Sequence, residues 1–288
     1  MKRIVLSILI FSTFLWDGYS REDTDSIAFH KADWQITKLK KGAEAMYAQI
    51  NMFNSVQSIN VIKYSAEQFK TKIVHRPKNR AKKLSRMARN IGAKLAINAG
   101  YFHVKSLTPS VYFRIGEQTY AHTDSTEVFR VDGVVGIKDK HGKDLCIEFS
   151  DTSQYETITN DWYAAIASGP MLMVEDSIVV EKTNVEGSKN SSPFFYRRHP
   201  RAAIGEDSQG NIYYLVIDGR FPGQADGASI YETAYICKLL GMSTAINLDG
   251  GGSATLWSNT RGVLNHPSDN KTWNNKGERN VPNMIIAY

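Results

Sequence analysis

The sequence contains little cysteine and, beyond its first twenty residues, no long apolar run. Its two cysteines among 288 residues, Cys146 and Cys237, exclude the small secreted folds that depend on several disulfides. Cys237 lies in an apolar helical pattern, where a buried thiol is the commoner state, so a Cys146–Cys237 disulfide is the less favoured alternative. No segment after residue 20 is long and apolar enough to span a bilayer, so we expect no stable membrane insertion after signal cleavage.

Several catalytic and binding motifs are also missing. The chain has no P-loop, no HExxH zinc motif and no EF-hand loop, and the segment GGSAT around Ser253 lacks the closing glycine of a GxSxG nucleophile elbow. It has no nucleic-acid-binding motif, so we expect no nucleic-acid partner. No cofactor is indicated with certainty, and a divalent cation bound by Asn247, Asp249 and Asp218 stays open as an alternative.

The composition is that of an ordinary globular protein with an uneven charge distribution. Hydrophobic residues make up 42% of the chain, charged residues 22%, and the net charge is +6 at pH 7. Basic residues gather at Lys38–Lys41 and again from Lys70 to Arg89. We interpret the second cluster as the solvent-facing side of a helix, with a polyanion-binding face as the alternative.

The first twenty residues have the pattern of a secretory signal. Lys2 and Arg3 precede an apolar run from Ile4 to Trp16, which is followed by a small-x-small ending at Ser20. The run is short for a spanning helix, so an uncleaved anchor is the less favoured alternative. We predict a signal peptide at 1–20, an N-terminal arm at 21–93 packed on the main domain, a main domain at 94–288, and a secreted or periplasmic location.

Hydrophobic periodicity predicts an α+β fold with a mixed β-sheet core and few helices. Amphipathic spacing predicts helices at Asn79–Gly92 and at about Ala228–Leu240. Apolar runs and alternation predict strands at 94–98, 111–113, 128–131, 134–137, 145–149, 171–174, 201–204, 212–217, 245–248 and 281–288.

One β-α-β crossover is predicted near the C-terminus. Strand 212–217, helix 228–240 and strand 245–248 form such a unit, whose two strands run parallel and end at one edge of the sheet. Asp218 and Asp249 follow those two strands directly, so we expect both carboxylates at that edge. Their backbones would lie about 5 Å apart if the strands are neighbours, and twice that if one strand intervenes. Asn98 ends a strand in a similar way and is a weaker candidate for the same edge.

These strand ends bring together a definite set of chemical groups. Two carboxylates about 5 to 10 Å apart are the equipment of glycoside hydrolysis. Arg220 and Arg201 add forked cations that suit a phosphate. The turn formed by Gly250, Gly251, Gly252 and Ser253 can offer backbone N–H groups to an anion. The combination predicts a substrate that carries both sugar and phosphate.

Five blocks in this order resemble the phosphodiester glycosidase family, which includes the enzymes that uncover mannose 6-phosphate. They are INAGYF, ASGPML, HPRAAIG…IYYLVIDGR, NLDGGGSATL and the tail NHPS…ERNVPNMII, and they extend over roughly Lys94 to Tyr288. The resemblance implies removal of a sugar, with N-acetylglucosamine as the first guess, from a sugar-1-phosphodiester. It also implies a set of site residues: Asn98, Arg201, Asp218, Arg220, Asp249, Gly250, Gly251, Ser253, Arg279 and Asn283.

The sequence therefore predicts an exported hydrolase that cleaves a sugar from a glycosyl-1-phosphodiester. Asp218 and Asp249 are the predicted catalytic carboxylates, and the residues leave open which one is acid, base or nucleophile. One alternative is a metal-dependent phosphodiesterase that cleaves the P–O bond. Another is a non-catalytic polysaccharide-binding protein whose exposed aromatic side chains would stack on sugar rings: Phe194, Phe195, Tyr196 and Trp273.

Overall fold

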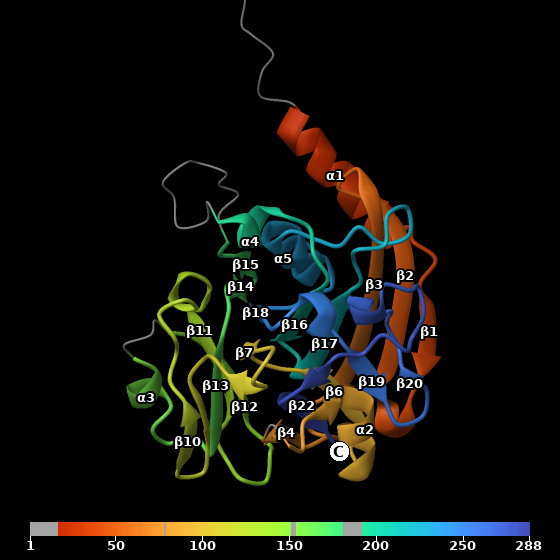
Figure 1. Cartoon of the computed structure of the whole chain (residues 1–288). Coiled ribbons are helices and arrows are strands. Elements are labelled where there is room, and N and C mark those ends of the chain that lie inside the picture. Colours follow the sequence, from red (N-terminus) through yellow and green to blue (C-terminus); the bar gives the residue numbers. More distant parts are fainter. Residues whose placement is uncertain (1–16, 78, 151–153, 181–191) are drawn as a thin grey trace, which may run out of the picture.

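The computed structural model describes residues 17–77, 79–150, 154–180 and 192–288 (Figure 1). Most of the predicted signal peptide lies outside these residues. Helix α1 (Asp17–His30) begins within the last four residues of that predicted peptide. The polar stretch after residue 20, for which the sequence pattern predicts no regular structure, is therefore helical. None of the helices in the described ranges combines the length and hydrophobicity needed to cross a bilayer.

The centre of the molecule is an eight-stranded sheet that places two predicted site residues at strand ends. Its strand order is β1-β2-β3-β17-β16-β18-β14-β15. In that order the strands are β1 (Gln35–Lys38), β2 (Glu44–Met52), β3 (Ser55–Ser65), β17 (Asn211–Ile217), β16 (Arg201–Glu206), β18 (Thr244–Asn247), β14 (Met171–Val174) and β15 (Ser177–Ile178).

Two five-stranded sheets pack beside the central sheet. One has the order β10 (Gln118–Ala121), β9 (Phe113–Ile115), β13 (Ala164–Ser168), β11 (Gly133–Ile137) and β12 (Leu145–Phe149). The other has the order β20 (Gly262–Val263), β19 (Leu256–Ser258), β6 (Leu95–Asn98), β22 (Asn283–Ala287) and β4 (Thr71–His75). Two short pairs complete the strands: β5 (Lys82–Lys83) with β21 (Asn280–Val281), and β7 (Phe102–His103) with β8 (Thr108–Pro109).

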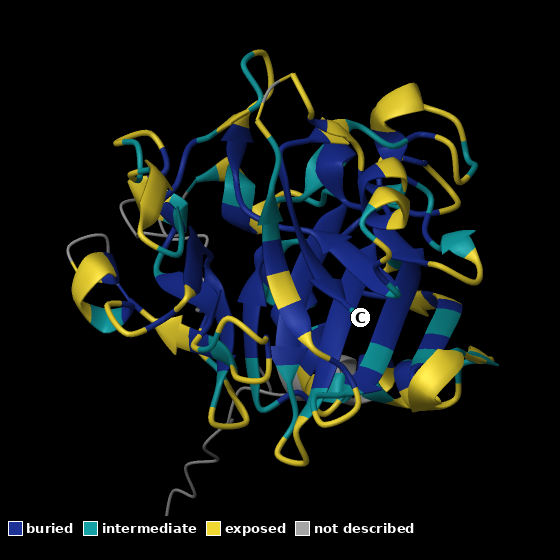
Figure 2. Cartoon of the chain, turned by 90° about the horizontal axis from the view of Figure 1, so that it is seen from below, coloured by how far each residue is buried: buried dark blue, intermediate teal, exposed yellow. Residues whose placement is uncertain are grey.

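The alternating side chains of β17 show how the layers are built. Tyr213, Leu215 and Ile217 pack in the cluster that contains helix α5 (Ile230–Leu239), whereas Ile212, Tyr214 and Val216 pack in the cluster shared with the other two sheets. A strand that is apolar on both faces is covered on both faces. In Figure 2 the strands are accordingly buried, and the exposed residues lie mainly in the loops and turns around them.

The predicted helices are present but shorter than expected. Helix α5 starts at Ile230 because Ser229 caps it and Glu232 completes a capping box. Helix α2 (Leu84–Asn90) starts later than predicted because residues 80 and 81 turn back onto the carbonyl of Pro77, and residues 82–83 then form β5. The remaining helices are α3 (Tyr155–Ile158) and α4 (Pro193–Tyr196), with short 3-10 turns at η1 (Lys40–Gly42), η2 (Val128–Arg130), η3 (Gly251–Ser253) and η4 (Ser268–Asn270).

One predicted strand is absent and the favoured state of the cysteines is confirmed. The segment 128–131, predicted as a strand, forms the turn η2 instead. Cys146 and Cys237 are both free thiols, so the less favoured disulfide is not formed.

Strands cross the predicted boundary between arm and main domain. Strand β3 pairs with β17, and β4 pairs with β22. Residues before 94 therefore supply strands to the central sheet and to the second five-stranded sheet.

Candidate active site

The predicted sheet edge is formed by strands that run in the same direction with one strand between them. Strands β17 and β18 each pair antiparallel with β16, so they are parallel to each other, and α5 lies between them in the chain. Their backbones are therefore roughly 10 Å apart, twice the spacing of neighbouring strands. Asp218 and Asp249 follow these strands, but their side chains have very different surroundings.

The carboxylate of Asp218 is buried and fully hydrogen-bonded. Its Oδ2 accepts bonds from Ser58 Oγ and Asn60 Nδ2, both at 2.9 Å. Its Oδ1 accepts bonds from Asn265 Nδ2 at 3.1 Å and from the His266 backbone N–H at 2.8 Å. The side chain of His266 also contacts Oδ2, at 3.1 Å from Nδ1. The residue is only 1% exposed and all five of these contacts come from the protein. Asp218 therefore holds the surrounding side chains in place and does not contact a ligand.

His266 is a site residue that the sequence did not single out. Because Nδ1 faces a carboxylate oxygen of Asp218, Nδ1 carries the proton and Nε2 is left as the acceptor. The ring stacks on Trp273 with centroids 3.7 Å apart, and Trp273 in turn meets the edge of Phe221, the residue after Arg220. The signal in the sequence was the NHPS block, whose histidine joins Asp218 across 48 positions.

Asp249 lies on the turn that follows β18. Its backbone N–H donates to Ala99 O at 2.9 Å, and its carbonyl accepts from Asn98 Nδ2 at 2.5 Å. Asn98 Oδ1 also accepts from the Thr255 backbone N–H at 3.0 Å. Asn98 therefore comes to the predicted edge, where both ends of its amide hold the turn in place.

The carboxyl of Asp249 has a strongly shifted pKa. Burial raises the pKa from its usual 3.8 to about 6, and the negative charge of Glu127 acts in the same direction. The hydroxyl of Ser253 and the positive charges of Arg130 and Arg279 oppose the shift without cancelling it. A carboxyl with a pKa near neutrality, surrounded by cations, is suited to proton transfer.

Two arginines lie over the glycine turn next to Asp249. A methyl group at Gly251 would lie 3.0 Å from Arg220 Nη2, and one at Gly252 would lie 2.5 Å from Arg279 Nη2. The turn is glycine because the guanidinium groups approach its backbone this closely. Gly251 N–H donates to Pro200 O, whereas the amides of Gly250 and Gly252 make no hydrogen bond within the described ranges.

Arg220 and Arg279 have the properties of an anion-binding pair. Burial and the charge of Arg279 lower the pKa of Arg220, which has no ion pair with any described residue. Arg279 contacts a single carboxylate oxygen, Asp269 Oδ1, at 2.6 Å from Nη2 and 3.0 Å from Nε. Two close guanidinium groups that share so little negative charge fit a phosphate.

Arg130 and Glu127 also belong to the surroundings of Asp249, although the sequence placed residues 128–131 in a strand. They form a partly buried ion pair in which Arg130 Nη2 lies 2.5 Å from Glu127 Oε2. The guanidinium of Arg130 lies 3.9 Å from the ring centroid of Tyr101. This stacked pair fixes one wall beside Asp249.

Arg201 is a buried part of the scaffold beside this wall. It donates from Nε to Ala228 O at 2.8 Å and from Nη2 to the carbonyls of Phe194 and Arg197 at 2.7 and 2.9 Å. Burial lowers its pKa to about 10. These bonds tie the chain before β16 to the start of α5.

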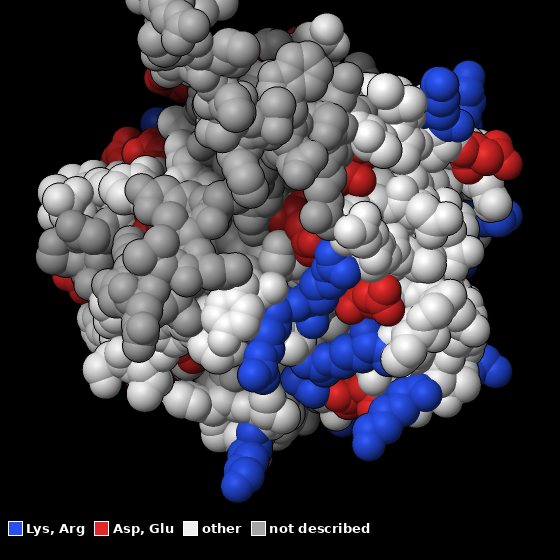
Figure 3. All heavy atoms as spheres, turned by 90° about the horizontal axis from the view of Figure 1, so that it is seen from above, with Lys and Arg blue, Asp and Glu red and all other residues white. Residues whose placement is uncertain are grey.

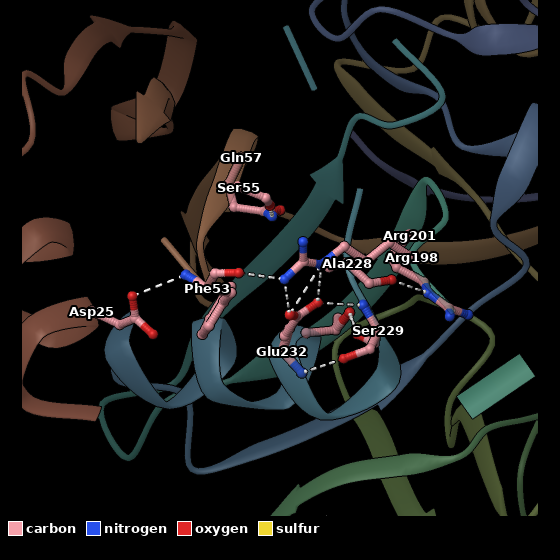
Figure 4. Close-up of polar contacts among 10 residues, drawn as sticks. Asp25, Phe53, Ser55, Gln57, Arg198, Arg201, Ala228, Ser229 and Glu232 are labelled. Carbon is pink, nitrogen blue, oxygen red and sulfur yellow. Dashed lines mark hydrogen bonds and ion pairs between the residues drawn. The ribbon is translucent and has the colours of Figure 1, made fainter. Parts of the chain in front are cut away.

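Figure 4 shows that the same region is anchored to the N-terminal strands. Arg198 forms a two-pronged ion pair with Glu232 and also donates to the carbonyl of Phe53. Asp25 accepts from the Phe53 backbone N–H at 2.9 Å. The position of Arg201 therefore depends on contacts with residues far earlier in the chain.

The remaining predicted residues are less well placed to meet a ligand. Ser253 Oγ and Asn283 Nδ2 are buried without a geometrically suitable hydrogen-bond partner among the described residues, although the Ser253 hydroxyl still lies close enough to affect Asp249. Of the aromatic side chains predicted to be exposed, Phe195 is buried and Phe194 is held between Arg130 and Arg201. Trp273 covers His266, and Tyr196 is the one that is exposed.

The residues present do not form an obvious metal site. In the described part of the chain, no three His, Cys, Asp or Glu side chains gather as a bound cation would require. Asn247 Nδ2 donates to Tyr101 Oη and to backbone carbonyls rather than to either aspartate.

Comparison with known proteins identifies the family. The profile of the phosphodiester glycosidase family matches residues 91–288, which contain every predicted site residue. The chain belongs to the phosphodiester glycosidase family. Its membership accounts for the order of the five sequence blocks.

Two mammalian proteins are similar to part of this family member. The mouse N-acetylglucosamine-1-phosphodiester alpha-N-acetylglucosaminidase is 31% identical over 98 residues, which are 34% of this chain and 18% of the mouse protein. The bovine protein of the same name is 36% identical over 89 residues, 31% of this chain and 16% of the bovine one. The chain thus aligns with less than a fifth of either relative.

Solved structures share the fold over most of the chain. A hypothetical protein from Synechocystis has a TM-score of 0.65 at 16% identity, covering 88% of this chain and 63% of that one. The catalytic domain of the zebrafish N-acetylglucosamine-1-phosphodiester alpha-N-acetylglucosaminidase, auto-inhibited by its pro-peptide, has a TM-score of 0.61 at 18% identity, covering 90% and 82%. A share of 88 to 90% of the chain is larger than residues 91–288, so the shared fold extends beyond that range.

Proposed function

We propose that this protein hydrolyses a glycosyl-1-phosphodiester, releasing a free sugar and a phosphate monoester. The observation that carries the proposal is the placement of Asp249, with a pKa of about 6, beside the Arg220–Arg279 pair. Family membership and the names of the mouse and bovine relatives support the same reaction and make N-acetylglucosamine the first sugar to try.

The phosphate would bind over the glycine turn. Arg220 and Arg279 face it with their guanidinium groups, and the unbonded amides of Gly250 and Gly252 add neutral donors. In cleavage of the bond between the anomeric carbon and oxygen, negative charge grows on the departing phosphate. Donors fixed at the place where that charge develops stabilise the transition state.

Asp249 would act as the base for the attacking water. In its ionised form it accepts a proton from water, whose oxygen bonds to the anomeric carbon while the C–O bond to phosphate breaks and its electrons stay on the phosphate. The departing group is a phosphate monoester, which needs little help from a general acid. Asp218 would act indirectly, by positioning His266. Its carboxylate accepts from Nδ1 of His266, which leaves Nε2 to accept a hydrogen bond from a substrate hydroxyl.

Export is part of the proposal and rests on the sequence alone. The charged and apolar pattern of residues 1–20 is the support for a secreted or periplasmic location. The substrate would then be an exported glycan that carries phosphodiesters.

A substrate panel tests the reaction class. The protein is incubated with the methyl phosphodiester of N-acetylglucosamine 1-phosphate, with N-acetylglucosamine 1-phosphate, and with methyl N-acetylglucosaminide. We expect release of sugar from the diester and at least a hundredfold less from the methyl glycoside, whose leaving group has no phosphate for the arginines to stabilise. Equal turnover of the methyl glycoside would contradict the phosphate-binding role of the arginines.

A further inference from the structure

A hollow beside helix α2 combines four basic side chains and no described acidic one. It has a volume of about 430 Å³ and is lined by Arg76, Arg80, Lys82 and Arg86, together with Asn79, Met87, Asn90 and Ile91. We call this hollow the basic groove and refer to these four side chains as its cations. Arg80, Lys82 and Arg86 are exposed, and Arg76 is half-buried.

The cations of the basic groove lack the partners that other arginines of this protein have. Arg130, Arg198 and Arg279 each form an ion pair with a carboxylate, whereas none of the four groove residues forms one with any described residue. On the face shown in Figure 3, by contrast, acidic side chains lie among the basic ones. Unpaired charge of one sign in a hollow concentrates the field and attracts polyanions.

The basic groove is a fixed surface rather than a loose basic tail. The amides of residues 80 and 81 donate to Pro77 O at 2.8 and 2.9 Å, and Arg76 N–H donates to Pro282 O at 2.7 Å. Helix α2 buries Leu84, Met87 and Ala88 against the second five-stranded sheet. A ligand would therefore meet cations carried on an ordered backbone.

The basic groove adjoins the loop that carries Arg279. Strand β5 pairs with β21, which begins directly after that arginine. On the same loop, Glu278 accepts bonds from the backbone and hydroxyl of Ser85, and Lys83 Nζ donates to Lys276 O at 3.3 Å. A chain lying in the groove would thus reach the edge of the candidate site.

A second hollow continues the basic groove and adds aromatic rings. It has a volume of about 400 Å³, shares Arg76 and Ile91 with the first, and is also lined by Tyr120 and Tyr288. Phosphates pair with guanidinium groups, and sugar rings stack on aromatic faces. A hollow rich in cations next to one that holds aromatic rings fits a polymer that contains both phosphate and sugar.

We propose that the basic groove binds an anionic glycan, a polymer of sugars joined by phosphodiesters, and feeds it to the site around Asp249. The inference rests on the proposed function for the identity of the cleaved bond. It gives the basic cluster at 70–89 a role in substrate selection, so the protein prefers a polymer to an isolated diester.

The test compares two double variants that each remove two positive charges. Arg80→Gln/Arg86→Gln changes the groove, and Lys31→Gln/Lys238→Gln changes exposed residues near α1 and in α5, at the opposite end of the molecule from α2 (Figure 1). Each is assayed on a linear polymer of N-acetylglucosamine 1-phosphate units and on the methyl phosphodiester of the monomer.

We expect the groove variant to lower kcat/KM for the polymer about tenfold and to leave the monomeric diester unchanged. The control pair should leave both unchanged. An unaltered rate on the polymer would overturn the inference, as would an equal loss on both substrates, which would mean that the groove supports the site rather than the polymer.

Binding separates this inference from the proposed function. Affinity of the polymer is measured for wild type and the groove variant, beside a single-stranded oligonucleotide of equal charge. If wild type turns over no diester but binds the polymer through Arg80 and Arg86, the proposed function is wrong and the binding role of the basic groove is confirmed. If the oligonucleotide binds as tightly as the polymer, the groove recognises charge alone and the glycan assignment is wrong.

Discussion

Replacing Asp249 by asparagine should remove activity and yet stabilise the fold. Burial raises the pKa of this carboxyl from 3.8 to about 6. Between these two pH values the unfolded chain has released a proton that the folded chain retains, so the free energy of unfolding falls as the pH rises. This rise of the Asp249 pKa corresponds to about 3 kcal/mol of unfolding free energy, all of which is lost above the folded-state pKa.

The size of the stabilisation should therefore depend on pH. We expect Asp249→Asn to increase the free energy of unfolding by about 3 kcal/mol at pH 7.5 and by about 1 kcal/mol at pH 4.5, because most folded molecules keep Asp249 protonated at the lower pH. Urea denaturation at the two pH values measures the difference. Wild-type kcat/KM should rise about tenfold from pH 5 to pH 7 as Asp249 ionises, and the variant should show neither the activity nor the rise.

A pH-independent stability change in this variant would refute the reasoning. It would mean that Asp249 is ionised in the folded protein at pH 4.5, with an ordinary or lowered pKa. Residual activity within tenfold of wild type would separately remove Asp249 from the role of base.

Three further substitutions probe the surrounding residues. Asp218→Asn should lower the free energy of unfolding by about 3 kcal/mol in urea denaturation, because an amide donor replaces an acceptor that five donors surround; a wild-type midpoint would contradict its structural role. His266→Gln should lower the thermal midpoint slightly, because it loses the ring stacked on Trp273, and should lower kcat about a hundredfold; an unchanged kcat would show that Nε2 meets no substrate. Arg220→Gln should lower kcat/KM for the diester at least tenfold without loss of stability, because Arg220 stabilises the charge that grows on the phosphate and has no ion pair with a described residue to lose; a destabilised protein with normal kcat/KM would show the opposite role.

The strands and their polar ends could be predicted because local pattern determines them. The apolar runs within 211–217 and 244–247 read directly as strands, and the helix between them fixes their parallel direction. The sequence could not decide whether these two strands are neighbours or are separated by a third strand. That depends on β16, which pairs with both and lies between them.

The roles of the two aspartates could not be separated from sequence. Both follow a strand and both precede glycine, yet Asp218 is surrounded by donors from β3 and from the loop at 265–266. Those contacts span 47 to 160 positions, beyond any local pattern. Glu127 and Arg130 were missed for a related reason, because the segment predicted as a strand at 128–131 forms a 3-10 turn, which brings Arg130 back onto Glu127 three residues earlier.

The position of the label after hydrolysis in ¹⁸O-water tests the central claim most directly. The diester is hydrolysed in labelled water, and the phosphate monoester, whose oxygens do not exchange, is analysed by mass. If water attacks the anomeric carbon, as we propose, the phosphate monoester carries no label and the released sugar gains it. A labelled phosphate monoester would mean attack at phosphorus, and the protein would be a phosphodiesterase rather than a glycosidase.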